Sequence, residues 1–305
     1  MAKPRLIVLM AGVCLMLLCG LSIHALATVT IYPVGMEFTE IQEAIDIAEV
    51  GSTIAISSGT YAQNLLITKP LRLVGLGDVI IRPADRSTPA IRVLETCDVG
   101  IYDIQVESAD YGIETTQSSC RLFGCSIRAS VACVEIVAFD TDAVLLSHCI
   151  FEGDRVGVMT LGDGAVEISD CCFEALGTGT LLAGLTSVLV RGCQFLGCYD
   201  SIGLASSVKA TVIGNRIEGS RGRGIRVAPA PDPLLDGPLV MVDNVIASCG
   251  QWAISLCDLD DPDMLTFAGL LAGSGNAVDG GADSLCPTGY SWPEGFLVTD
   301  VIDSD

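Results

Sequence analysis

Hydrophobic and polar residues alternate along the middle of the chain in a short pattern that returns at a nearly fixed interval. Each copy contains a Cys or Asn anchor that is followed, two residues later, by an apolar residue. The clearest copies are Cys125/Ile127, Cys149/Phe151, Cys171/Phe173, Cys193/Phe195, Asn215/Ile217 and Asn244/Ile246. Successive anchors are separated by 24, 22, 22, 22 and 29 residues. A period near 22 residues is too short for ankyrin or tetratricopeptide units and lies in the range of β-solenoid coils.

Each copy of the pattern predicts two or three short strands. Three and five residues before the anchor stand two apolar residues with a polar residue between them, as in Val166 and Ile168. Nine and eleven residues after the anchor comes a second alternating pair, as in Val158 and Thr160. A period of two gives a strand one inward face. Small residues such as Gly157 precede the second strand and suit a tight bend.

Coils that stack in parallel about 4.8 Å apart align equivalent positions into ladders. The anchors then form one column, in which neighbouring Asn side chains can hydrogen-bond to each other. Phe151, Phe173 and Phe195 form an aromatic stack beside it. A β-sandwich with similar strand spacing is the alternative, but it does not explain why one residue type returns in one column. We therefore expect an all-β chain that folds as a parallel β-solenoid.

The first 27 residues have the features of a cleavable secretory signal. Lys3 and Arg5 precede an apolar run over residues 6–21, and the segment ends in Ala25-Leu26-Ala27. An uncleaved anchor is the alternative, because the run is close to the lower limit for a spanning helix. No later stretch is expected to span a membrane. We expect an exported protein, either periplasmic, secreted or at the cell surface.

Residues 28–93 predict an N-terminal cap and the first coils. Ile41, Ala44, Ile45 and Ala48 fall on one face of a short amphipathic helix, for which Thr39 is the expected N-cap. A helix at this place would cover the open end of the solenoid. Strands are expected at 53–56, 65–67, 71–74 and 79–81. Coils follow over residues 94–284, with insertions near 228–238 and 257–263, and residues 285–305 are expected to form a C-terminal plug and tail.

The opening of the chain resembles that of right-handed parallel β-helix proteins. The resemblance is carried by the segments IQEAID (41–46), GSTI (51–54), GTY (59–61) with Asn64, and KPLRLVG (69–75). Similar openings occur in the NosD-type periplasmic family, in carbohydrate-binding and sugar-hydrolase repeat proteins, and in pectin methylesterases. The resemblance implies a right-handed parallel β-helix of the pectin-lyase-like kind. The catalytic segments of pectin methylesterases and polygalacturonases are not found in this sequence.

The acidic composition limits the classes of partner. The chain has 37 Asp and Glu against 16 Lys and Arg, a formal net charge of −21. Such a surface repels phosphate backbones, so nucleic acid is not expected as a partner. Divalent cations are attracted to it, and calcium is the one cofactor that the residues suggest.

The two insertions enter at the same point of neighbouring coils, so their loops are expected to project together. The first carries Asp232 and Asp236, and the second carries Asp258, Asp260, Asp261 and Asp263. Carboxylate oxygens suit Ca²⁺, which makes the second set candidate calcium ligands and the first set candidate ligand-binding residues. The spacing is not that of an EF-hand, and solvated acidic loops are the alternative. Three nearby arginines complete the candidate ligand site: Arg216, Arg223 and Arg226.

Other side chains are weaker candidates for chemistry. A row of glutamates stands three residues after several anchors (Glu107, Glu152, Glu174, Glu218). Stacking would bring Glu152 and Glu174 about 5 Å apart, a separation that retaining glycosidases use, although any ladder produces it. His148 can act as a general base, but Ser147 is expected to point away from it, which leaves no nucleophile.

Of the 14 cysteines, Cys14 and Cys19 lie in the expected signal segment, and the 12 that remain are many for an exported protein. Disulfides are expected in such compartments, and the pairs Cys120/Cys125, Cys193/Cys198 and Cys249/Cys257 are close enough in sequence to be considered. Buried thiols that fill an inward column are the alternative.

These features favour a noncatalytic binding or structural protein directed to glycans or cell-surface components. A calcium-assisted polysaccharide lyase or glycoside hydrolase is the first alternative. A NosD-like accessory role in copper-site assembly is the second, and it rests on the resemblance and on the stacked thiols.

Overall fold

The computed structural model describes residues 31–34, 39–95, 98–108, 110–138, 142–205, 209–228, 238–256, 271–279, 285–287 and 291–298. The predicted signal segment lies outside these ranges. Within them no helix has the length and apolar character that crossing a bilayer requires.

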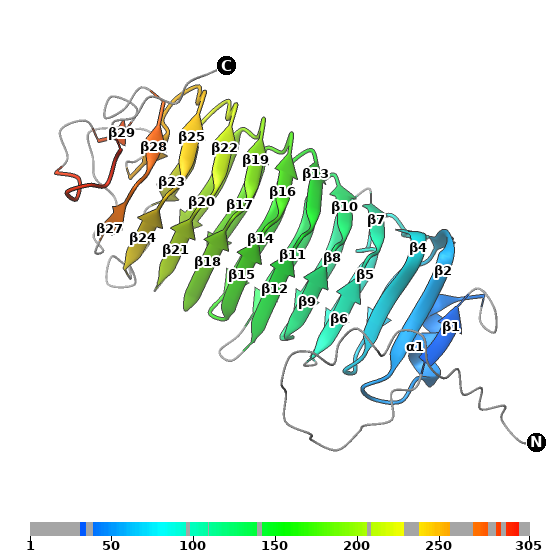
Figure 1. The fold of residues 1–305 in the computed structure, drawn as a ribbon. Coiled ribbons are helices and arrows are strands. Elements are labelled where there is room, and N and C mark those ends of the chain that lie inside the picture. The colour runs from blue at the N-terminus through cyan, green and yellow to red at the C-terminus, as the bar shows by residue number, and fades with distance from the viewer. Residues whose placement is uncertain are drawn as a thin grey trace, which may run out of the picture.

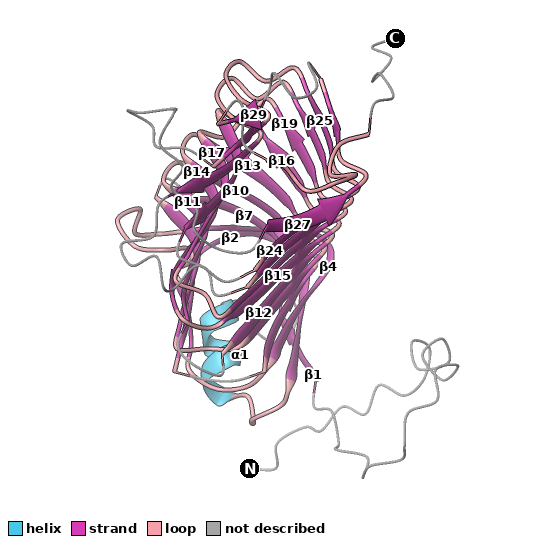
Figure 2. Cartoon of the chain, turned by 90° about the vertical axis from the view of Figure 1, so that its left-hand side faces the viewer, coloured by secondary structure: helices cyan, strands magenta, loops and turns pink. Residues whose placement is uncertain are grey.

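The described strands form two parallel sheets that wind around one interior (Figures 1 and 2). The ten-stranded sheet consists of β3 (Leu65–Ile67), β5 (Ile91–Leu94), β8 (Tyr111–Thr116), β11 (Ala132–Ala138), β14 (Val156–Gly162), β17 (Thr178–Ala183), β20 (Asp200–Ala205), β23 (Ile225–Ala228), β26 (Ile254–Ser255) and β29 (Leu285–Cys286). In the end-on view of Figure 2 its strands β11, β14 and β17 lie on the left, and β4, β15 and β27 of the other sheet lie on the right.

The nineteen-stranded sheet contains two rows of strands that Figure 1 shows side by side. One row has β6 (Val99–Tyr102), β9 (Cys120–Phe123), β12 (Ala143–Ser147), β15 (Ala165–Ser169), β18 (Ser187–Arg191), β21 (Ala210–Ile213), β24 (Leu239–Val242) and β27 (Leu271–Ser274). The other has β7 (Gln105–Ser108), β10 (Ser126–Ala129), β13 (Ile150–Gly153), β16 (Cys172–Glu174), β19 (Gln194–Leu196), β22 (Arg216–Glu218), β25 (Val245–Ala247) and β28 (Ala277–Val278). At the N-terminal end lie β1 (Ile31–Val34), β2 (Thr53–Ala62) and β4 (Arg72–Arg82).

Each strand pairs in parallel with its equivalent in the next coil, so the predicted β-solenoid is confirmed. The register joins Phe151 to Phe173 and Phe173 to Phe195. These three rings are fully buried and stack with centroids 4.8 and 4.6 Å apart. The aromatic stack predicted from the sequence is therefore present.

The N-terminal helix α1 (Ile41–Ile47) also forms where the apolar spacing predicts it. Ile41, Ala44 and Ile45 are buried, as is Ala48 just after the helix. The predicted N-cap was wrong by one residue, because Glu40 occupies that position and its side chain makes no capping bond. The first strands are also longer than expected, since β4 joins two predicted strands into one.

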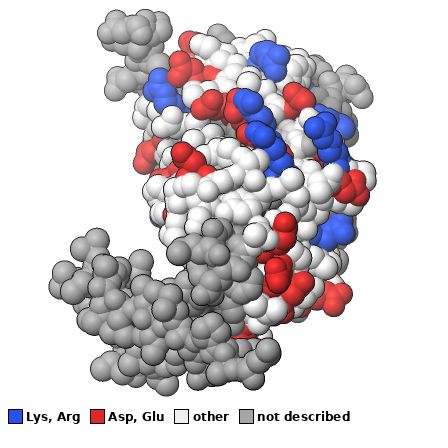
Figure 3. Space-filling model, turned by 90° about the vertical axis from the view of Figure 1, so that its right-hand side faces the viewer, with Lys and Arg blue, Asp and Glu red and all other residues white. Residues whose placement is uncertain are grey.

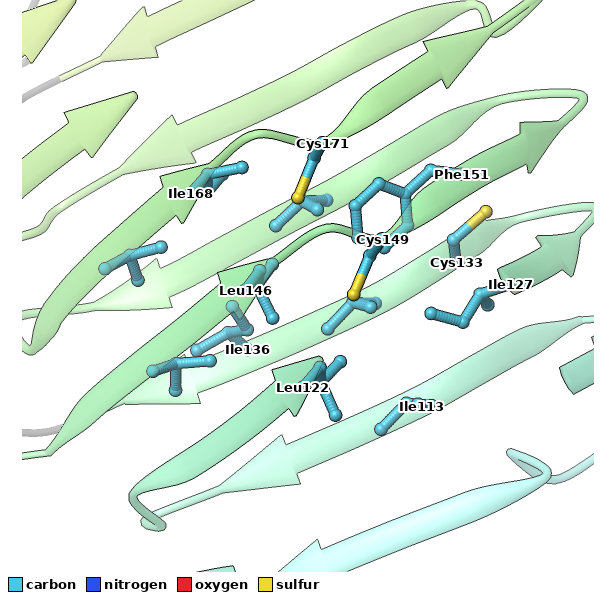
Figure 4. Close-up of a cluster of buried hydrophobic side chains, with 14 of the residues drawn as sticks. Ile113, Leu122, Ile127, Cys133, Ile136, Leu146, Cys149, Phe151, Ile168 and Cys171 are labelled. Carbon is cyan, nitrogen blue, oxygen red and sulfur yellow. The ribbon is translucent and has the colours of Figure 1, made fainter. Parts of the chain in front are cut away.

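The core consists of inward side chains from all three rows of strands. Figure 4 shows Leu122 and Leu146 of one row, Ile127 and Phe151 of the second, and Ile136 of the ten-stranded sheet around one interior. Burial of this apolar surface is the main stabilising term, at roughly 25 cal/mol per Å².

The close packing of neighbouring coils at the start of β14 depends on a glycine. A Cβ built at Gly157 would lie 2.5 Å from the carbonyl oxygen of Gly179 and 2.8 Å from the Phe173 ring. A larger residue there would force the neighbouring coils apart.

The Asn anchors form the predicted hydrogen-bonded ladder, which Asn276 in the following coil extends. Asn215 Nδ2 donates to Asn244 Oδ1 at 2.9 Å, and Asn244 Nδ2 donates to Asn276 Oδ1 at 2.9 Å. Asn244 Nδ2 also donates to the Val212 carbonyl oxygen at 2.9 Å. All three side chains are buried, so the ladder satisfies polar groups that no water reaches.

The Cys anchors occupy the same column as buried, free thiols (Figure 4). Cys149 Sγ donates to the Ser147 carbonyl oxygen at 3.3 Å, and Cys171 Sγ makes the equivalent bond to Ser169. The three disulfide pairings considered from the sequence are wrong, because each includes a described cysteine that is free: Cys120, Cys125, Cys193, Cys198 and Cys249. Cys286 is disulfide-bonded.

Candidate functional site

The outer surface of the ten-stranded sheet carries an ordered series of side chains, one from each coil. The register aligns Arg92, Glu114, Glu135, Met159, Leu181, Gly203, Arg226 and Ser255 in one row, which we call the outer row. Its neighbours along the strands, such as Val134 and Val158, point inward and are buried. Arg92, which is ion-paired with Glu114, begins the row. The row is then acidic at Glu114 and Glu135, apolar in the middle and basic at Arg226, beyond which Ser255 is buried.

The basic end is a group of two arginines around one buried carboxylate. Arg223 Nη1 and Arg226 Nη1 each lie 3.8 Å from Asp200 Oδ2, and the Arg223 backbone N–H donates to Asp200 Oδ1 at 2.9 Å. Tyr199, the residue before Asp200, has an exposed side chain. We call Tyr199, Asp200, Arg223 and Arg226 the arginine site.

The environment of Arg223 is unusual for a guanidinium. Its side chain is only 9% exposed, and Nε is buried without a hydrogen-bond partner among the described residues. Burial lowers the pKa of Arg223, the nearby charge of Asp200 raises it, and that of Arg226 lowers it. An arginine stays charged throughout such shifts, so this site holds more positive charge than its single carboxylate neutralises.

The acidic end contains Glu114 and Glu135 in adjacent coils. Glu114 pairs with Arg92 at 3.2 Å. Burial raises the pKa of Glu135, and the negative charges of Glu114 and Asp110 raise it further. This pair was not predicted from the sequence, although both glutamates stand between two inward residues of their strand, a position that marks an outward side chain.

The structure brings together two of the three predicted arginines. Arg216 lies on β22 in the nineteen-stranded sheet, where its guanidinium bonds to Glu218 at 3.1 Å. It therefore takes no part in the arginine site on the ten-stranded sheet. The carboxylates of the two insertions lie outside the described residues: Asp232, Asp236, Asp258, Asp260, Asp261 and Asp263.

The glutamate row of the other sheet is present, and three of its four members, Glu107, Glu152 and Glu218, are ion-paired. Glu152 aligns with Glu174 in the register and bonds to Arg128, and Glu107 bonds to Arg82 at 2.7 Å. These side chains are half-exposed. Figure 3 shows acidic and basic side chains mixed on the face that it presents. No group of three or more His, Cys, Asp or Glu side chains in the described ranges is arranged to hold a metal ion.

The sequence predicts that Ser147 points away from His148, and this prediction is wrong. Its hydroxyl lies 2.8 Å from His148 Nδ1, within hydrogen-bond distance. His148 has a left-handed backbone (φ 53°) at the turn, and its ring lies 5.0 Å from that of Phe123. The turn conformation allows the contact between adjacent residues, which strand alternation alone does not predict.

The buried thiols should resist modification in the folded protein. Burial raises the pKa of Cys120 and of Cys133 to about 12, and that of the half-buried Cys172 to about 11. Because the thiolate is the reactive form, we expect Ellman's reagent at pH 8 to modify the described free cysteines slowly in the native protein and completely after denaturation in guanidinium. Rapid reaction of several thiols before denaturation would contradict their burial.

Comparisons with known proteins agree with this architecture. The family model described as "Right handed beta helix region" matches residues 89–232 and 136–267. A polygalacturonase from Erwinia carotovora ssp. carotovora is similar in structure, with a TM-score of 0.57 and 10% identity over 88% of this chain and 95% of that chain. A pectin methyl esterase from the rice weevil has a TM-score of 0.50 and 12% identity over 82% and 88%.

At 10% and 12% sequence identity, the similarity to these two solved structures establishes the fold of this chain and not its activity. No curated protein sequence matches this chain. The two segments that the family model matches overlap and together cover more than half of the 305 residues. With its parallel coils, inward ladders and short N-terminal helix, the chain belongs to the right-handed β-helix family.

Proposed function

We propose that this is an exported, noncatalytic glycan-binding protein, which holds a polysaccharide along the outer surface of its ten-stranded sheet. The observation that carries the proposal is the apolar strip in the middle of that surface. Val156, Met159 and Leu181 are half-buried there, and Leu161 is 50% exposed. Apolar surface that is rimmed by polar groups is typical of a binding site.

The order of side chains suits an extended polymer. Adjacent coils place equivalent groups about 4.8 Å apart, so successive units of a chain lying across the coils would meet successive side chains. Charged groups stand at both ends of the strip, with Glu135 on one side and Arg226 on the other. The two neighbours with the same fold are, by their names, a polygalacturonase and a pectin methyl esterase, which supports a polysaccharide as the ligand class.

Replacement of Leu161 by Asp should weaken polysaccharide binding at least tenfold, because it puts a charge into the apolar strip. The matched control is Ile150→Asp, since Ile150 is also exposed, at 45%, but lies on β13 of the other sheet. Binding is measured by titration calorimetry against a panel of acidic and neutral polysaccharides. Equal loss in both variants, or in neither, would contradict the placement of the site.

The same mixtures test whether the protein is catalytic. We expect no increase in reducing ends and no unsaturated products after prolonged incubation, with or without Ca²⁺. Product formation would favour the lyase or hydrolase alternative and would overturn the noncatalytic part of the proposal.

A further inference from the structure

The arginine site is short of hydrogen-bond acceptors. Each guanidinium has five N–H donors, and Arg223 and Arg226 each direct only Nη1 at the single carboxylate of Asp200, at 3.8 Å, which is beyond hydrogen-bond length. Arg223 Nε has no partner within the described ranges, although its side chain is nine-tenths buried. An unpaired buried donor destabilises a fold, so the site as it stands is incomplete.

Arg226 is the arginine of this site that an acceptor in solvent can reach. Arg226 keeps 26% of its side chain exposed, and it belongs to the outer row next to the apolar strip. Asp200 holds both guanidinium groups from the buried side, where it also accepts the Arg223 backbone N–H. Two cations that share one anion retain one net positive charge, which faces outward.

An exposed aromatic ring lies next to these cations. Tyr199 is 47% exposed, and a Cβ at Gly222 would lie 3.0 Å from its ring and 2.6 Å from Asp200 Oδ1. Only glycine at position 222 lets the two coils approach this closely. An apolar ring face beside charged donors is a combination that can bind a sugar ring and its acidic substituent together.

We propose that the arginine site binds the carboxylate of an acidic sugar unit, which it takes between Arg223 and Arg226 while Tyr199 packs against the sugar ring. This inference rests on the proposed function and narrows its ligand to polysaccharides that contain uronic acids. A planar carboxylate matches the fork of a guanidinium and accepts two parallel hydrogen bonds. A neutral glycan has no group that can neutralise the remaining charge.

The test compares polygalacturonate with the same polymer after methyl esterification, by titration calorimetry at low salt. The wild-type protein should bind the free acid at least tenfold more tightly than the ester. Arg226→Gln should weaken binding of the free acid at least tenfold and leave binding of the ester unchanged. Because the site is partly exposed, added salt should also weaken binding of the free acid.

Arg216→Gln is the matched control, since it removes an ion-paired arginine from the other sheet. It should change binding of the free acid by less than twofold, and far-UV circular dichroism should show both variants folded. Monomeric galacturonate and inorganic sulfate form a third arm. Binding of these small anions as tight as that of the polymer would contradict a polysaccharide site.

The outcomes separate this inference from the proposed function. Equal affinity for acid and ester, or no effect of Arg226→Gln, would overturn the carboxylate site and leave glycan binding in place. Absence of binding to every polysaccharide would overturn both.

Discussion

Replacement of Asn244 by Ala should lower the free energy of unfolding by about 4 kcal/mol, because four buried polar groups each lose one hydrogen bond, at about 1 kcal/mol each. Asn244 Oδ1 accepts from the backbone N–H of Asn215 at 3.1 Å and from Asn215 Nδ2 at 2.9 Å. Its own Nδ2 donates to the Val212 carbonyl oxygen. The side chain is fully buried, so water cannot easily replace these bonds.

Urea denaturation followed by far-UV circular dichroism measures the change. Cys149→Ala is the matched control, because Cys149 occupies the equivalent column position in another coil and its thiol makes only weak bonds, to the Ser147 carbonyl oxygen and to the neighbouring thiols of Cys125 and Cys171. That variant should lose only about 1 kcal/mol. If the two variants lost equal stability, the Asn ladder would contribute no more than ordinary packing.

The fold was predictable because each coil repeats the same inward positions. Cys149, Cys171 and Cys193 return in one column, so a single period places all of them in the interior, and the structure confirms this burial. The same regularity explains why the disulfide candidates were wrong. Two cysteines that are close in sequence occupy different positions around a coil, so their thiols need not meet. Cys193 and Cys198 are an example, since both are free.

The arginine site was only partly predictable. Arg223 and Arg226 were singled out because they are close in sequence, but so was Arg216, which a turn and a strand place on the other sheet. Asp200 was missed, although it lies one coil before Arg223. The period of the hydrophobic residues identifies only the side chains that point inward. Contacts between outward side chains of neighbouring coils also depend on the local register, so the contact with Asp200 could not be predicted from that period.

Replacement of Phe173 by Ala should lower the free energy of unfolding by about 3–5 kcal/mol. Phe173 is the central ring of the buried stack, with neighbours at 4.8 and 4.6 Å, so its removal leaves a cavity and breaks both ring contacts. Gly157 and Gly179 pack their backbones against these rings, which limits how far the neighbouring coils can collapse into the space.

Phe123→Ala is the control, because it removes an exposed aromatic ring and so shows how much stability is lost when no buried cavity is formed. Phe123 is 43% exposed on β9 and contacts only the ring of His148 among the described aromatic side chains. Its removal should cost about 0.5 kcal/mol, as is usual for surface substitutions. Thermal and urea denaturation of the two variants give the comparison, and a similar cost at both positions would show that the interior relaxes around a missing ring. Because the cost of a cavity rises with its volume, a large difference would instead show that neighbouring coils hold their spacing when one inward side chain is lost.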